Sequence, residues 1–211
     1  MVAMIIKLDE FTLKKACTLL AARDSALAGV LEQYGFPPLW ARAPGFSTLV
    51  HIILEQQVSL ASANAAFARL CAYSDGLLTP AGLLAFSDDQ LQAAGLSRQK
   101  MRYVRHLSEV IVQGQFNLES LEMLSDEDVR QRMTQLKGIG NWTADIYLSE
   151  CLLRPDILPQ GDIAMQEAFR VLKNLPARPN HDHFVLGTAH WRPWRSVGTR
   201  ILWHYYLSAR R

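Results

Sequence analysis

Apolar positions recur every three or four residues along most of the chain, a spacing that places them on one face of an α-helix. It predicts helices over residues 11–22, 24–34, 47–57, 59–70, 97–113, 125–136, 144–152, 162–173 and 193–208. In the third segment, for example, Leu49, Ile52 and Ile53 share a face with Gln56. Strand-like alternation is confined to a few residues near Ile5. The pattern therefore predicts an all-α protein.

Residues typical of helix ends support this prediction. Serines stand at N-cap positions, where a hydroxyl can accept a hydrogen bond from the first turn. They are Ser59, Ser87, Ser97 and Ser125, and the last resembles a capping box with Asp128. Gly35 and Gly114 end two helices. We expect about ten helices with short links, without an internal repeat or a long linker.

Composition excludes several classes of protein. The chain has 211 residues, 49% of them hydrophobic, which is enough for a substantial core. No apolar run approaches the roughly 18 residues of a membrane span. The N-terminus, MVAMIIKLDEF, lacks a basic leader and a clear cleavage site, so we expect a cytoplasmic protein. The three cysteines, Cys17, Cys71 and Cys151, are too few for a four-thiolate zinc or iron–sulfur site, and we expect them to be buried.

Charge is distributed unevenly along the chain. Residues 1–153 contain 13 Lys/Arg and 16 Asp/Glu, whereas residues 154–211 contain 9 and 4. The basic excess includes Arg192, Arg195, Arg200, Arg210 and Arg211. Such an asymmetry suits a surface that faces an anion, and it suits an ordinary solvated face equally well.

A glycine-bracketed turn, LKGIGNW, joins two predicted helices. Gly138 and Gly140 permit backbone conformations closed to other residues and let another backbone approach. The unpaired N–H groups of the helix that follows can bind an anion such as a DNA phosphate. By itself the turn fits a tight connection between two core helices just as well.

Four segments together resemble one family. LKGIGNWTAD resembles the helix–hairpin–helix of the HhH-GPD DNA glycosylase superfamily, and LPQGDIAMQEAF resembles the segment with its essential aspartate. PLWARAPGFSTLVHIILEQQVSLASA and WRPWRSVGTRILWHYY resemble the first and last segments of the alkylation-repair branch. The chain is identified as a member of the AlkA-type, 3-methyladenine DNA glycosylase II branch. The resemblance implies one domain over residues 1–211 with two helical lobes and a helix–hairpin–helix at about 126–151. In a departure from the larger bacterial relatives, we expect no N-terminal β lobe, because the chain leaves no room for one.

Asp162 is the candidate catalytic residue. Alone, it would serve as the N-cap of a helix over residues 163–172. Breaking an N-glycosidic bond builds positive charge on the sugar, which a carboxylate can stabilise while it orients or deprotonates water. The resemblance places the essential aspartate at this position, after Gly161.

The resemblance also implies a base pocket and an absent nucleophile. Bifunctional relatives carry a nucleophilic lysine at the position of Trp142, so we expect a monofunctional, water-using enzyme. Trp142 and Trp203 are implied to line the pocket, where an aromatic face attracts a cationic base. Trp40 and Phe46 are weaker pocket candidates, and Trp142 could instead anchor the hairpin in the core.

Further residues are implied to contact DNA. Base extrusion leaves a gap in the stack, and the family's wedge residue aligns with Gln57, which otherwise is a plain surface residue. The predicted DNA contacts are Gln56, Gln57, Ser59, Lys137, Gly138, Gly140, Asn141, Thr143 and Arg195. Arg195 could equally make a core contact.

No cofactor is expected. His181, His183 and His190 lack the companions of a metal site. A structural Na⁺ or K⁺ could bind the hairpin carbonyls of Thr134, Leu136 and Ile139, as in relatives.

The expected function is base excision repair by a monomeric glycosylase that acts on double-stranded DNA containing alkylated bases. We expect it in the cytoplasm, associated with the nucleoid in a bacterium, or in the nucleus of a eukaryote. Cationic lesions such as 3-methyladenine and 7-methylguanine should be preferred over hypoxanthine or ethenoadenine, because no general acid stands beside Asp162. The alternatives are a bifunctional glycosylase/AP lyase, a non-catalytic hairpin protein that binds DNA, and a helical adaptor that ignores DNA.

Overall fold

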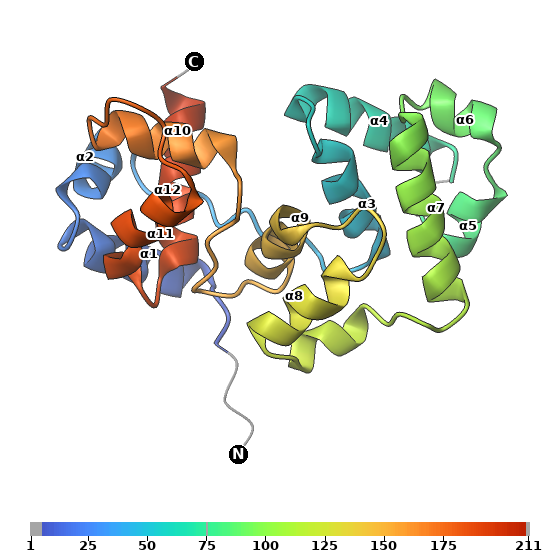
Figure 1. Ribbon diagram of the computed structural model, residues 1–211, viewed down its shortest axis with the longest axis horizontal. Coiled ribbons are helices and arrows are strands. Elements are labelled where there is room, and N and C mark those ends of the chain that lie inside the picture. Colours follow the sequence, from blue (N-terminus) through green and yellow to red (C-terminus); the bar gives the residue numbers. More distant parts are fainter. Residues whose placement is uncertain (1–5, 75, 210–211) are drawn as a thin grey trace. The chain divides into compact units, whose positions relative to one another are not determined.

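The computed structural model describes residues 6–74 and 76–209, which form helices joined by loops (Figure 1). These residues contain no β-strand, so the all-α prediction is confirmed; Ile5 itself lies outside them. The chain divides into two compact units. The first consists of Met1–Ala41 and Leu148–Arg211, and the second consists of Arg42–Tyr147. The chain therefore passes from one unit to the other twice.

The first unit is built around the C-terminal helix. Its elements are α1 (Glu10–Ala21), α2 (Ser25–Tyr34), α10 (Ile163–Leu172), α11 (His181–Gly187), η3 (Ala189–Trp191) and α12 (Arg195–Ser208). Helices α1, α2 and α10 all pack against α12. The fully buried Trp191 lies so close to Gly198 that a Cβ atom there would overlap its ring. Glycine at this position lets α12 approach the indole closely.

A buried carboxylate ties the parts of this unit together. Asp24 is the N-cap of α2, and its side chain is fully buried. It accepts hydrogen bonds from Lys173 at 2.6 Å and from Trp191 at 2.9 Å, and it lies 3.0 Å from His190. Segments that are some 150 residues apart in the sequence thus meet at one carboxylate, which is paired as a buried charge must be.

The second unit surrounds an apolar helix. Its elements are α3 (Phe46–Glu55), α4 (Leu60–Ala72), α5 (Pro80–Ala85), α6 (Asp88–Ala93), α7 (Arg98–Val112), η1 (Glu119–Met123), α8 (Asp126–Thr134) and α9 (Asn141–Ile146). Helix α3 packs against α4, α7 and α9, and Leu49, Ile52 and Ile53 are buried as their spacing predicts. The π-helical turn η2 (Tyr147–Cys151) continues α9 into the first unit.

The predicted N-caps are confirmed. The hydroxyls of Ser59, Ser87, Ser97 and Ser125 each accept a hydrogen bond, at 3.1–3.2 Å, from the backbone N–H three residues later. Ser125 also donates to Asp128 at 2.6 Å. Each of these contacts is local, which explains why the residue types alone located them.

Some helix ends and short helices differ from the prediction. Helix α3 ends at Glu55 and α8 at Thr134, each two residues before the predicted end. At α3 the backbone leaves the helical region at Gln56, which has ψ +123°, and Gln57 follows with φ +57°. Helices α5 and α11 escaped prediction because six or seven residues are too few to show a helical period. None of the described helices is both long enough and apolar enough to span a bilayer.

Candidate functional site

The glycine turn between α8 and α9 is shaped by an aromatic side chain. Gly138 has φ +85°, and a Cβ atom there would overlap the ring of Tyr103 on α7. Glycine is therefore required both for its backbone angle and for the space. Helix α9 begins after Gly140, which has no side chain to cap it. Lys137, Gly140 and Asn141 are exposed, whereas Ile139 between them is buried.

A single glutamine connects this turn to the end of α3. The side-chain amide of Gln56 donates to the carbonyl oxygen of Gly138 at 2.9 Å and to Oγ1 of Thr143 at 2.9 Å. Gln56 is half-buried, whereas Gln57, the next residue, is exposed. Ser59 caps α4 and is also exposed. The structure thus brings the predicted DNA contacts of the 56–59 and 137–143 segments together within one unit.

The same region contains a lysine that periodicity did not single out. Nζ of Lys100, in the first turn of α7, donates to the carbonyl oxygen of Leu54 at 2.6 Å. Burial lowers the pKa of Lys100. The contact satisfies one of the free carbonyls at the C-terminus of α3. Lys100 and Tyr103 are one turn apart on α7; Lys100 contacts the end of α3, and Tyr103 lies against the glycine turn.

Asp162 is the N-cap of α10 in the first unit. Its Oδ1 accepts a hydrogen bond from the backbone N–H of Met165 at 2.9 Å, so the N-cap interpretation is confirmed. Gly161 before it has φ +77°, a conformation that favours glycine. Because the cap bond fixes its side chain, the half-buried carboxylate has a defined orientation at the head of the helix.

Two of the predicted pocket residues meet in the first unit. The rings of Trp40 and Trp203 are 6.4 Å apart, edge to face at 76°. Trp40 also contacts His204 edge to face, and its backbone has φ +49°. Both indoles are half-buried, so each has part of its surface in contact with solvent.

The other two pocket candidates belong to the second unit and differ from each other. Trp142 is half-buried as the second residue of α9. Phe46 opens α3 and is buried with the apolar residues of that helix. Phe46 therefore lies in the core of the second unit. A role for Phe46 in a base pocket stays a prediction.

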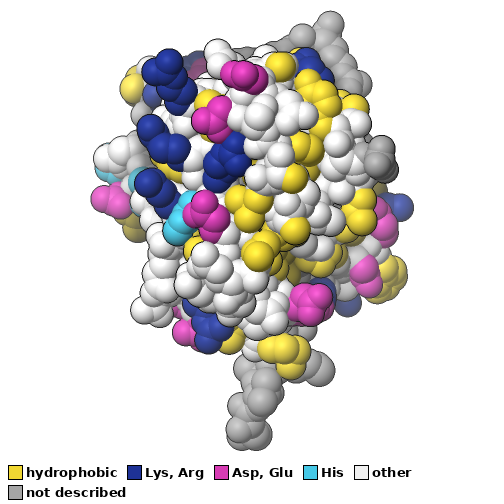
Figure 2. Space-filling model, turned by 90° about the vertical axis from the view of Figure 1, so that its right-hand side faces the viewer, with side chains coloured by type: hydrophobic (Ala, Val, Ile, Leu, Met, Phe, Trp, Pro, Cys, Tyr) yellow, Lys and Arg dark blue, Asp and Glu magenta, His cyan; other side chains and the backbone are white. Residues whose placement is uncertain are grey.

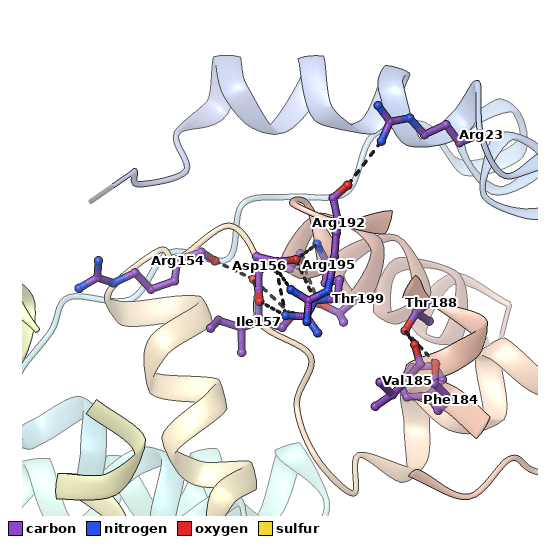
Figure 3. A network of polar contacts seen from close by, with 11 residues as sticks. Arg23, Arg154, Asp156, Ile157, Phe184, Val185, Thr188, Arg192, Arg195 and Thr199 are labelled. Carbon is purple, nitrogen blue, oxygen red and sulfur yellow. Dashed lines mark hydrogen bonds and ion pairs between the residues drawn. The ribbon is translucent and has the colours of Figure 1, made fainter. Parts of the chain in front are cut away.

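The predicted DNA contact Arg195 has an internal partner. Its guanidinium donates to both carboxylate oxygens of Asp156, at 2.8 and 3.0 Å, and to the Asp156 carbonyl oxygen at 2.8 Å (Figure 3). Arg192 lies 3.3 Å from the same carboxylate. Such paired contacts hold a guanidinium in a fixed plane. The alternative of a structural contact for Arg195 is therefore the one that its geometry supports.

Arg200 is the clearest departure from the expected basic surface. It is fully buried on α12 and donates to the backbone oxygens of Leu39, Ser149 and Ser196. Burial lowers the pKa of Arg200 to about 10, although Glu150 opposes this. Arg200 therefore cannot be part of a surface that faces an anion. Arg210 and Arg211 lie outside the described residues.

Basic side chains also gather elsewhere on the molecule. Figure 2 shows one face, on which Lys and Arg side chains collect beside a band of hydrophobic ones. Helix α7 by itself contains Arg98, Lys100, Arg102 and Arg105, of which Arg98 and Arg102 are exposed. Internal pairing of Arg195 and burial of Arg200 therefore take two charges away from the C-terminal basic excess, whereas α7 exposes positive charge in the other unit.

Among the described residues, histidines and acidic residues do not gather into a metal site. Within residues 6–74 and 76–209 there is no group of three or more His, Cys, Asp or Glu side chains that could hold an ion. His181 and His183 lie on α11, and His190 is next to Asp24. At the hairpin, the Leu136 carbonyl accepts the Ile139 N–H at 3.1 Å. A monovalent cation at the carbonyls of Thr134, Leu136 and Ile139 stays a prediction.

The model of the HhH-GPD superfamily of base excision DNA repair proteins matches residues 50–188, about two thirds of the chain. The chain belongs to this superfamily. The matched segment includes the 56–59 turn, the hairpin and Asp162, whereas Trp40 and Trp203 lie outside it. The matched segment thus contains all the residues predicted to bind DNA or catalyse, apart from Arg195.

Individual HhH-GPD relatives are similar over most of the chain. DNA-3-methyladenine glycosylase 1 of Schizosaccharomyces pombe is 29% identical over 161 residues, 75% of this chain and 71% of that protein. DNA-3-methyladenine glycosylase 2 of Escherichia coli is 27% identical over 202 residues, 88% of this chain and 67% of that protein.

Solved structures support the same HhH-GPD fold. The S. pombe 3-methyladenine DNA glycosylase in complex with abasic DNA superposes with a TM-score of 0.84 at 27% identity, covering 90% of this chain and 95% of that one. A DNA-3-methyladenine glycosidase from Bacillus halodurans has a TM-score of 0.73 at 29% identity, covering 95% and 91%.

Proposed function

We propose that this protein is a monofunctional DNA glycosylase that removes alkylated bases from double-stranded DNA in base excision repair. It hydrolyses the bond between deoxyribose and a base such as 3-methyladenine or 7-methylguanine, and it leaves an abasic site. The observation that carries the proposal is the hydrogen-bonded carboxylate of Asp162 at the head of α10, in a chain with an HhH-GPD hairpin. The names of the relatives support this choice of lesion.

Binding begins at the hairpin. Backbone N–H groups after Gly140, together with the exposed Lys137 and Asn141, contact phosphates without reading base sequence. The damaged nucleotide then leaves the stack, and Gln57 enters the gap. An alkylated base carries positive charge, so it is attracted to the faces of aromatic rings such as those of Trp203 and Trp142.

Bond cleavage depends on Asp162. As the glycosidic bond lengthens, positive charge develops on the sugar, and the carboxylate stabilises it. The carboxylate also orients or deprotonates the attacking water. The bonding electrons leave with the base, which becomes neutral because it was already cationic. Protonation by a general acid is therefore unnecessary, and cationic lesions should be released faster than hypoxanthine or ethenoadenine.

The decisive experiment compares wild type with Asp162→Asn in single-turnover release of 3-methyladenine and 7-methylguanine from methylated DNA. Asparagine is also a good N-cap, so the variant removes the charge and retains the Met165 bond. We expect base release to slow by about 10²–10⁴-fold while DNA affinity is retained. Asp9→Asn makes the same change at the N-cap of α1 and should leave the rate unaltered.

Three results would contradict the proposal. Release by Asp162→Asn at the wild-type rate would mean that this carboxylate is not catalytic. A borohydride-trapped adduct between protein and DNA would show lyase chemistry, which Trp142 in place of a lysine does not support. Faster release of hypoxanthine or ethenoadenine than of 7-methylguanine would show that a general acid is present after all.

A further inference from the structure

The turn after α3, residues 56–59 (the Gln57 turn), is held in an uncommon conformation. Gln57 has φ +57°, a region that non-glycine residues seldom adopt and that persists only where the surroundings enforce it. Its own side chain is exposed and makes no hydrogen bond among those the structure records, so it does not enforce the conformation. The enforcing contacts must come from its neighbours.

The contacts on either side of Gln57 differ in strength and reach. On the C-terminal side, Ser59 bonds to α4, which it caps: its hydroxyl contacts Ser62, and its carbonyl oxygen accepts the Ala63 N–H. On the N-terminal side, the amide of Gln56 makes two 2.9 Å hydrogen bonds, to residues 82 and 87 positions away. One acceptor, Gly138, is inside the glycine turn, and the other, Thr143, is in the first turn of α9. The side-chain amide of Gln56 therefore fixes both the backbone at residue 56 and the distance from this turn to the hairpin.

The hairpin does not depend on this amide in return. Gly138 is also held by the ring of Tyr103, and the turn has its own backbone bonds, from Leu136 N–H to Met133 at 3.0 Å and from Ile139 N–H to Leu136 at 3.1 Å. Loss of the Gln56 amide would therefore release the Gln57 turn more than it would disturb the hairpin. The conformation of the Gln57 turn thus depends on the hairpin, whereas the hairpin does not depend on the Gln57 turn.

We propose that Gln56 is a positioning residue that locks the Gln57 turn to the hairpin, so that phosphate contact by the hairpin places Gln57 at the base stack. This role rests on the function proposed above and refines it, because Gln56 then acts through Gln57 and not by touching DNA. Both amide hydrogens already have acceptors within the protein. The lock matters for extrusion from a paired duplex and not for cleavage of a base that is already unpaired.

The test uses Gln56→Met, which keeps the length of the side chain and removes both donors. Single-turnover release of 7-methylguanine from a fully paired duplex should fall by about 10–100-fold, the loss that follows a displacement of about 1 Å. The same lesion in an unpaired bulge of that duplex should be released within about twofold of the wild-type rate, since extrusion is then nearly complete beforehand. Gln92→Met, at an exposed site on α6, is the matched control and should match wild type on both substrates.

A double-variant cycle separates positioning from general destabilisation. Gln57→Ala should slow release from the paired duplex in the wild-type background and should have no further effect in the Gln56→Met background, because the turn is already misplaced. Equal losses on paired and bulged lesions, or additive effects of the two variants, would overturn the positioning role alone. Absence of base release by the wild-type protein would overturn the proposed function, and this inference with it.

Discussion

Replacing Gly138 with alanine tests whether Tyr103 confines the hairpin. Gly138 has φ +85°, and a Cβ atom would overlap the Tyr103 ring. Gly114 is a matched control, because it has φ +70° in the same unit but nothing within 4 Å of the new atom. The left-handed backbone costs either alanine variant about 1–2 kcal/mol. Only Gly138→Ala also overpacks its surroundings, which adds about 1–3 kcal/mol.

We therefore expect Gly114→Ala to lose about 1–2 kcal/mol of unfolding free energy and Gly138→Ala about 2–5 kcal/mol. Urea denaturation followed by far-ultraviolet circular dichroism measures both losses, and each kcal/mol corresponds to about 2–4 °C in Tm for a chain of this size. In a Tyr103→Leu background the ring is gone, so Gly138→Ala should lose only as much as Gly114→Ala. Equal losses for the two alanine variants in the wild-type background would refute confinement by Tyr103.

Two other predictions concern charge. Lys137→Met should reduce the slope of log K for DNA binding against log salt concentration by about one phosphate contact, because Lys137 is exposed. Arg195→Met should leave that slope unchanged and lower the free energy of unfolding by about 1–3 kcal/mol, since Arg195 is paired with Asp156. A reduced slope for Arg195→Met would show that Arg195 contacts phosphate. Burial acts to raise the pKa of Asp24, but hydrogen bonds from Lys173, Trp191 and His190 lower it from 3.8 to about 2. Because the folded-state pKa is depressed, this carboxylate contributes about 2 kcal/mol above pH 4 that is lost as the pH falls toward 2. Asp24→Asn should remove that contribution at pH 7 and flatten the acid-unfolding curve between pH 4 and 2; an unchanged curve would contradict the pairing.

Residue types alone located most helix starts. Ser59, Ser97 and Ser125 cap the helices that they were predicted to cap, because an N-cap bond spans only three residues. The buried face of α3 followed from its spacing for the same local reason. The glycine turn and Asp162 could be found as well, although for Asp162 the sequence could not separate capping from catalysis.

What only the tertiary structure decided are the contacts between residues distant in sequence. Arg195 pairs with Asp156 across 39 residues, and Gln56 bonds to Gly138 across 82. From the sequence, Arg195 could contact either DNA or the core, and Arg200 was part of the basic excess; the ion pair with Asp156 holds Arg195, and burial removes Arg200 from the surface. Part of the need for glycine at 138 likewise comes from Tyr103, which lies 35 positions earlier on α7. Local hydrogen bonds are encoded in neighbouring residue types, whereas the fate of a charge or an amide depends on which distant group the fold brings to it.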